Sequence, residues 1–153
     1  MAYPTAVSRE IAAPALQVWE LVADLPSMGR WSPENQGGTW SRGASGPAPG
    51  AVFRGRNKSG LRRWSTTVTV TECEPGQVFE FSVRFMAWPV ANWRYEFEDT
   101  EGGCTVTESW RDNRAPWVRT VGRTMGVHDA EHAKSEMAAT LASLAKAAEA
   151  AAV

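Results

Sequence analysis

The sequence predicts an α+β domain in which one antiparallel sheet packs against a long C-terminal helix. Apolar and polar residues alternate along successive runs that short turns separate, a pattern typical of antiparallel hairpins. The last stretch, Asp129 to Ala150, contains no Gly or Pro and is rich in Ala, the strongest helix former. The length of 153 residues suits one domain, spanning 1–153, with one core.

Composition and charge exclude several classes of protein. Hydrophobic residues make up 43% of the chain and charged residues 22%, as in ordinary globular proteins. The net charge of −1 gives no global field that would attract nucleic acid, and no apolar run is long enough to span a membrane. The N-terminus lacks the basic start and apolar core of a signal peptide. We therefore expect a cytoplasmic protein, monomeric or homodimeric, with neither a nucleic-acid partner nor a membrane span.

The first third of the chain reads as one strand, two helical pieces and a loop. Ala6 to Ile11 is a short strand, and Pro14 to Ala23 is a helix with Pro14 at its first position. Pro26 to Arg30 could form one more helical turn. A loop rich in Gly and Pro follows, with a short strand around Thr39 to Arg42 and a mobile surface segment at Gly43 to Gly50.

Five strands then follow in tight succession, and we expect Trp88-Pro89 to separate the third of them from the fourth. They are Ala51 to Asn57, Arg62 to Glu74, Gln77 to Ala87, Ala91 to Asp99 and Cys104 to Arg111. Strict alternation assigns one buried face to this sheet. The residues assigned to that face are Phe53, Trp64, Val68, Val70, Phe79, Phe81, Val83, Phe85, Trp93, Tyr95, Phe97, Val106 and Trp110.

The last helix presents an uneven apolar face. That face consists of Ala130, Ala133, Met137, Leu141, Leu144 and Ala148. Met and Leu fill space in the second half, whereas the first half offers only Ala130 and Ala133 after Gly126. A helix with small residues at one end leaves a gap against a sheet, and we expect a ligand there. Between 113 and 126 we expect a separate helical segment with a hinge near Gly126, carrying the stripe Val118, Val121, Met125 and His128.

Several short sequence motifs in the chain resemble those of the START-like superfamily, and more narrowly those of bacterial polyketide cyclase/dehydrase-like proteins. The motifs are Ile11-Ala-Ala-Pro14, Val18-Trp19, Asp24-Leu-Pro26, Trp31-Ser-Pro33, Val70-Thr-Glu-Cys-Glu-Pro-Gly76 and Met137-Ala-Ala-Thr-Leu141-Ala-Ser-Leu144. The resemblance implies a helix-grip fold, in which a curved antiparallel sheet of about seven strands surrounds the C-terminal helix. Two short helices follow the first strand, and an apolar cavity lies between sheet and helix. The superfamily includes carriers, cyclases, hydrolases and co-chaperone modules, so the resemblance leaves catalysis open.

The ring-bearing inward positions predict a cavity wall for an apolar or aromatic molecule. The candidate ligand-binding residues are Trp64, Phe81, Phe85, Trp93, Tyr95, Glu108, Trp110, Ala130, Ala133 and Met137. The alternative is that any one of these rings is plain core.

Glu108 is the most specific candidate for a functional residue, because alternation places its carboxylate inward between Val106 and Trp110. Such a carboxyl is costly to bury unless it is paired or protonated. It could bind a ligand by hydrogen bonds or act as a general acid or base with a raised pKa, with Tyr95 as a second candidate catalytic residue. The structural alternatives are a pair with a nearby Arg and a bulge that turns Glu108 outward.

Three further groups have weaker functional interpretations. His128 and His132 have the spacing of a metal or acid/base pair but lie opposite Met137, which favours a solvated role, and no zinc-type Cys/His cluster exists. We therefore expect no metal and no cofactor. Arg54, Arg56, Lys58 and Arg63 face outward around one hairpin, where they could dock an acidic partner or protect a strand edge. Cys73 and Cys104 fall on strands that the family order separates, so a disulfide is not expected.

Three hypotheses of function follow from these observations. The first is binding of an apolar small molecule, lipid-like or polyketide-like, between sheet and helix. The second is a cyclase or dehydratase that uses the same cavity with Glu108 as acid/base. The third is an interaction module that uses the basic hairpin or the region of Trp31.

Overall fold

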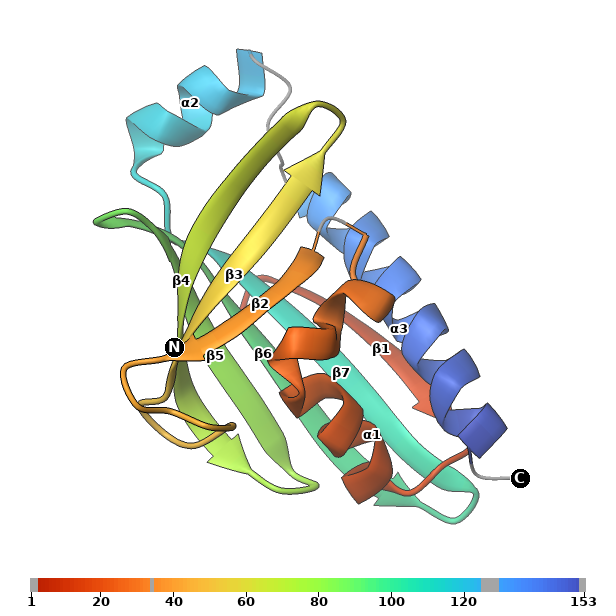
Figure 1. The fold of residues 1–153 in the computed structure, drawn as a ribbon. Helices are drawn as coiled ribbons and strands as arrows, with labels where there is room; N and C mark the ends of the chain where they lie inside the picture. Colours follow the sequence, from red (N-terminus) through yellow and green to blue (C-terminus); the bar gives the residue numbers. More distant parts are fainter. Residues whose placement is uncertain (1–2, 34, 125–129, 152–153) are drawn as a thin grey trace.

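A single seven-stranded antiparallel sheet curves around the long C-terminal helix α3, which confirms the predicted helix-grip α+β fold (Figure 1). The computed structural model describes residues 3–33, 35–124 and 130–151. The strand order is β1-β7-β6-β5-β4-β3-β2. The elements in chain order are β1 (Thr5–Ile11), α1 (Ala15–Ala23), η1 (Leu25–Arg30), β2 (Asn35–Ser41), β3 (Val52–Ser59), β4 (Arg62–Glu74), β5 (Val78–Phe85), β6 (Trp88–Thr100), β7 (Gly103–Asp112), α2 (Pro116–Thr124) and α3 (Ala130–Ala151).

The short connections form as their residues predict. Pro26 lies in the first turn of η1, as expected. Pro14 is one position earlier than predicted: it is the N-cap of α1 in an extended conformation, and Ala15 is the first helical residue. Between β4 and β5, Gln77 donates its backbone N–H to the Glu74 carbonyl, and Gly76 has a φ of +73°, which Gly adopts without strain. The short strand expected around 39–42 is longer and begins earlier, since β2 covers Asn35–Ser41 and pairs with β3.

The β5–β6 hairpin departs from the prediction. Trp88-Pro89 does not break the sheet: both residues begin β6, and the turn lies just before them at Met86, which has a φ of +55°. The register shifts between Val83 and Arg84, so the strict alternation of β5 ends there. As a result Phe85, which alternation places inward, is 42% exposed.

The two halves of α3 pack differently on the sheet. Leu141, Leu144 and Ala148 in the second half are fully buried in the main core, together with Val18 and Phe79. Ala133 and Met137 in the first half belong to a smaller cluster with Ala91 and Trp110. The space between these two clusters is where the site lies.

The segment before α3 contains α2 (Pro116–Thr124), a separate helix as predicted. The proposed hinge at Gly126 and the stripe members Met125 and His128 lie outside the described residues. In the described chain, Cys73 on β4 and Cys104 on β7 are free thiols with two strands between them. No helix of the described part is both long and apolar enough to cross a membrane.

Candidate functional site

A cavity of about 410 Å³ lies between the concave face of the sheet and the first half of α3. Residues of η1 close one side, with Leu25 and Met28 in the wall. From α3 the wall includes Ala133, Met137 and Thr140. Small side chains at this end of the helix leave the space that bulky ones fill farther along.

Most of the residues predicted to bind a ligand lie in this wall. Those that line the cavity are Trp64, Phe81, Trp93, Tyr95, Glu108, Trp110, Ala133 and Met137. They come from four strands and one helix, and the register explains their proximity. Phe81 pairs with Trp93, which pairs with Trp110, so three rings form one row across β5, β6 and β7. The rings of Trp93 and Trp110 are 6.3 Å apart between centroids.

Two predicted wall residues do not reach the cavity. Phe85 lies beyond the register shift near the end of β5 and points to solvent. Ala130 is the first residue of α3 and is exposed, because the wall that this helix provides begins one turn later, at Ala133. Both errors have the same origin. The strand alternation continues to Phe85 only if β5 keeps its register, and the helical spacing includes Ala130 only if the first turn of α3 covers the sheet; neither condition holds.

Glu108 lies inward on β7 and is 2% exposed. Its neighbours in register are Tyr95 on β6 and Val7 on β1, so no bulge turns it outward. The Tyr95 hydroxyl donates a hydrogen bond of 2.7 Å to Glu108 Oε1. The other oxygen, Oε2, is buried and has no hydrogen-bond partner in the described chain. The bond therefore comes from Tyr95, and the Arg pair considered from sequence is not observed among the described residues.

The surroundings of Glu108 favour its neutral form. Burial raises the pKa of Glu108 to about 8, the hydrogen bond from Tyr95 opposes that rise, and the charge of Glu136 adds to it. Burial and the Glu108 carboxyl also raise the pKa of Tyr95 well above its usual value, so its hydroxyl keeps its proton. Because Oε1 accepts a hydrogen bond from Tyr95, the proton of a neutral Glu108 belongs on Oε2, where it has no acceptor among the described residues.

The structure adds polar wall residues that sequence reasoning missed. They are Ser32, Asn35, Asn57, Ser59, Arg62, Thr66, Arg114, Glu136 and Thr140. Glu136 and Thr140 had a detectable signal, because with Ala133 and Met137 they follow the spacing of one helical face. The polar strand residues had none, since Ser, Asn and Thr on a strand fit a solvated position equally well.

The remaining candidates lie outside the cavity wall. His132 is exposed on α3 with its Nε2 3.6 Å from Glu136 Oε1, and His128 is outside the described residues. In the described ranges, no three His, Cys, Asp or Glu side chains gather where they could hold one metal ion. Arg54, Arg56, Lys58 and Arg63 are exposed, as predicted, on β3 and β4.

Comparison with known proteins agrees with the fold. A family model described as "Polyketide cyclase / dehydrase and lipid transport" matches residues 5–149. A polyketide-cyclase-like protein of Corynebacterium glutamicum is 32% identical, with 94% of this chain and 83% of that chain covered and a TM-score of 0.53.

More distant structures show the same architecture. Ara h 8.0201 is 11% identical over 95% of this chain and 96% of that one, with a TM-score of 0.67. StfQ, a di-domain ARO/CYC protein of the steffimycin biosynthetic pathway, is 14% identical with a TM-score of 0.67, and the match covers 94% of this chain but 44% of StfQ. Among curated proteins, none matches this sequence.

Proposed function

The chain belongs to the polyketide cyclase/dehydrase and lipid transport family, and on that premise we propose that it binds an apolar small molecule, lipid-like or polyketide-like, in the cavity between the sheet and α3. The observation that carries the proposal is the combination of an aromatic-walled cavity with one buried, unpartnered carboxyl oxygen, Glu108 Oε2.

The size and wall of the cavity suit such a ligand. Its volume of about 410 Å³ lies in the range of small-molecule sites. Trp64, Trp93 and Trp110 offer ring faces, and large apolar surfaces contribute most of the binding energy in pockets of this kind. Arg62 and the other polar residues of the wall provide hydrogen-bonding groups.

Glu108 supplies the specific polar contact in this proposal. A buried polar atom without a partner is costly, so a ligand that satisfies Oε2 gains more than one that does not. A neutral carboxyl donates its proton in a hydrogen bond, and the matching ligand group is therefore a carbonyl or other oxygen acceptor. We expect the ligand to be apolar over most of its surface with such an oxygen near Glu108.

The first experiment asks whether the protein carries a ligand at all. Protein purified without detergent is extracted with organic solvent, and the extract is analysed by mass spectrometry beside that of an unrelated protein purified identically. The proposal expects apolar, oxygen-bearing species in near-stoichiometric amount. An empty extract, together with failure to bind any member of a panel of fatty acids and aromatic ketones, would refute binding.

A matched pair of probes tests the role of Glu108. Fluorenone and fluorene differ by one carbonyl oxygen, so the ratio of their dissociation constants isolates the polar contact. We expect wild type to prefer the ketone by roughly 3- to 10-fold at pH 6, the worth of one hydrogen bond. The preference should vanish in Glu108→Leu, and it should weaken above pH 8, where the ionised carboxyl cannot donate. An unchanged ratio in Glu108→Leu would remove Glu108 from the site.

A cyclase or dehydratase activity is the second candidate, favoured by the position of two carboxyl groups and a phenol at one cavity. Glu108, Glu136 and Tyr95 all line it, and a neutral Glu108 could protonate or polarise a ligand carbonyl. Glu108→Gln keeps the shape but cannot exchange a proton. If Glu108 is catalytic, turnover of a poly-β-ketone substrate should fall by about 10²–10⁴-fold with nearly unchanged affinity. Unchanged turnover would exclude this role.

A further inference from the structure

Exposed apolar side chains gather at one end of the molecule. Seven large hydrophobic residues are exposed in the described chain, and Leu16 on α1 is the only one outside three segments. Those segments are the β3–β4 turn (58–63), the β5–β6 turn (84–89) and α2 (116–124), which together we call the apolar tip. The exposed apolar residues of the tip are Leu61, Phe85, Met86, Trp88, Trp117 and Val121.

The sheet register places the three segments at the same end. Thr67 on β4 pairs with Arg84 on β5, so Arg62–Thr66 extends beyond Arg84 by roughly 16 Å, in the direction of the β5–β6 turn. Asp112 at the end of β7 pairs with Ala91, and Asn113 donates its backbone N–H to the Val90 carbonyl. The chain that leads to α2 therefore leaves the sheet beside the start of β6. Figure 1 shows α2 beyond the β5–β6 turn and at the same end of the molecule as the β3–β4 turn.

The apolar face of α2 is largely exposed to solvent. Trp117 and Val121, one helical turn apart, are 64% and 50% exposed. The helix makes no extensive contact with the sheet or with another helix in the part of the chain that is described. Exposed apolar side chains that are clustered on a protein surface mark an interaction surface.

The charge of the tip selects the kind of partner. Its three segments contain six of the sixteen Lys and Arg residues and none of the seventeen Asp and Glu residues. Lys58, Arg63 and Arg119 are exposed among the apolar residues. A chain with a net charge of −1 thus has one cationic end that carries Trp, Phe, Met and Leu. Protruding apolar and aromatic tips flanked by cations suit an interface between water and an anionic lipid layer.

We propose that the apolar tip docks onto anionic lipid surfaces, with Trp88, Trp117 and Leu61 entering the interfacial layer and Lys58 and Arg63 contacting lipid phosphates. The same end of the molecule contributes Ser59, Arg62 and Val90 to the cavity wall. The docked face therefore adjoins the cavity. The proposal is independent of what the cavity binds, because docking is measured without a ligand.

Vesicle flotation of the full chain tests this proposal. Wild type is mixed with vesicles of phosphatidylcholine, alone or with phosphatidylglycerol, and the bound fraction is measured. We expect strong binding to the anionic vesicles and weakening at about 1 M salt, where the Debye length falls to about 3 Å. Trp88→Ser/Trp117→Ser and Lys58→Glu/Arg63→Glu should each reduce binding by about tenfold or more. None of these four residues lines the cavity.

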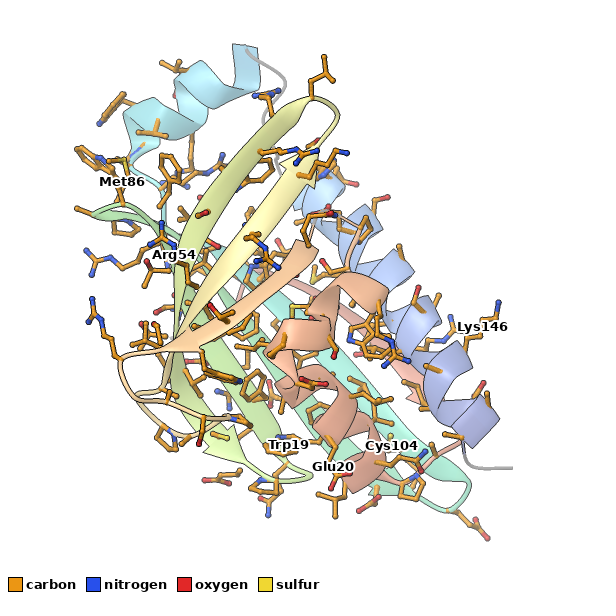
Figure 2. The ribbon with its side chains drawn as sticks, viewed as in Figure 1. Trp19, Glu20, Arg54, Met86, Cys104 and Lys146 are labelled. Carbon is orange, nitrogen blue, oxygen red and sulfur yellow. The ribbon has the colours of Figure 1, made fainter. Side chains whose placement is uncertain are left out.

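Matched controls lie outside the tip. Leu16→Ser removes the one large hydrophobic residue that is exposed outside the tip in the described part of the chain. Lys146→Glu reverses a charge on α3, on the other side of the molecule from Met86 (Figure 2). Both should bind as wild type does, and unchanged melting temperatures show that all variants fold. Absence of wild-type binding, or equal binding by the tip variants, overturns the proposal. A dimer seen by light scattering that the Trp variant abolishes, without vesicle binding, would assign the tip to a second copy and also overturns it.

Discussion

At the scale of single residues, Glu108 is a position where burial of a polar group lowers the stability of the fold. Its carboxyl is buried in a wall of rings, one oxygen is bonded to Tyr95, and the other has no partner in the described chain. Purely structural positions of this kind are normally occupied by apolar residues. An acid that remains protonated at neutral pH can do what an apolar residue cannot, namely donate a hydrogen bond into the cavity.

The raised pKa of Glu108 predicts a particular dependence of stability on pH. The folded state holds the proton up to about pH 8, whereas the unfolded chain releases it near 4.5. Between these values the folded state binds more protons, so the free energy of unfolding falls as pH rises, by up to about 1.4 kcal/mol per pH unit. Above pH 8 this contribution is constant.

Glu108→Gln should remove that slope, because the amide does not titrate. Denaturant unfolding of wild type and variant between pH 5 and pH 9 measures the difference, and the variant should gain relative stability steadily up to about pH 8. Glu98→Gln, at an exposed position on β6, controls for the loss of one charge. Parallel profiles for wild type and Glu108→Gln would mean that Glu108 is ionised in the folded protein near neutral pH.

Sequence alternation was sufficient to place Glu108 but not its surroundings. Strand β7 is regular, so parity alone placed its residues correctly. The charge on Glu136 comes from another element, and its contribution depends on how α3 is rotated against the sheet. No local pattern encodes that rotation, although the spacing from Ala133 to Thr140 is consistent with it.

At the scale of elements, α3 combines a packing half with a cavity half. Leu141 and Leu144 are fully buried in the main core, whereas Ala133 and Thr140 face the cavity. The sequence indicated this division through the sizes of the side chains. It did not indicate where the helix begins to cover the sheet, and Ala130 was misplaced for that reason.

Leu141→Ala tests the packing half of this helix. The change deletes buried methyl groups and leaves a cavity, so the free energy of unfolding should fall by about 2–5 kcal/mol. Lys146→Ala, exposed on the same helix, should change it by less than about 0.5 kcal/mol. Chemical denaturation measures both values. Equal effects of the two changes would show that α3 packs through another face.

The β5–β6 hairpin shows why boundaries are harder to predict than elements. Pro89 suggested a break, but a Pro near the start of a strand is compatible with pairing. The register shift at Val83 and Arg84 then changes the faces of the last residues of β5. Phe85 was therefore assigned to the interior although it belongs to the exposed tip.

At the scale of the whole molecule, two features meet at one end of the sheet. The cavity wall includes residues of the β3–β4 hairpin and of the segment that precedes α2. The apolar tip lies at the same end of the sheet. The opposite end of the sheet carries α1 and the fully packed half of α3. The helix-grip fold thus separates a stable core from the region assigned to binding.

The most direct test of the central claim is uptake of an apolar fluorescent dye by a pair of Trp variants on α3. Ala133→Trp places an indole in the cavity, whereas Ala138→Trp places the same group at an exposed position of the same helix. Titration with the dye should give saturable binding to wild type and to Ala138→Trp, and little or none to Ala133→Trp at an unchanged fold by circular dichroism. Equal dye affinity in all three proteins would contradict a binding cavity between the sheet and the first half of α3.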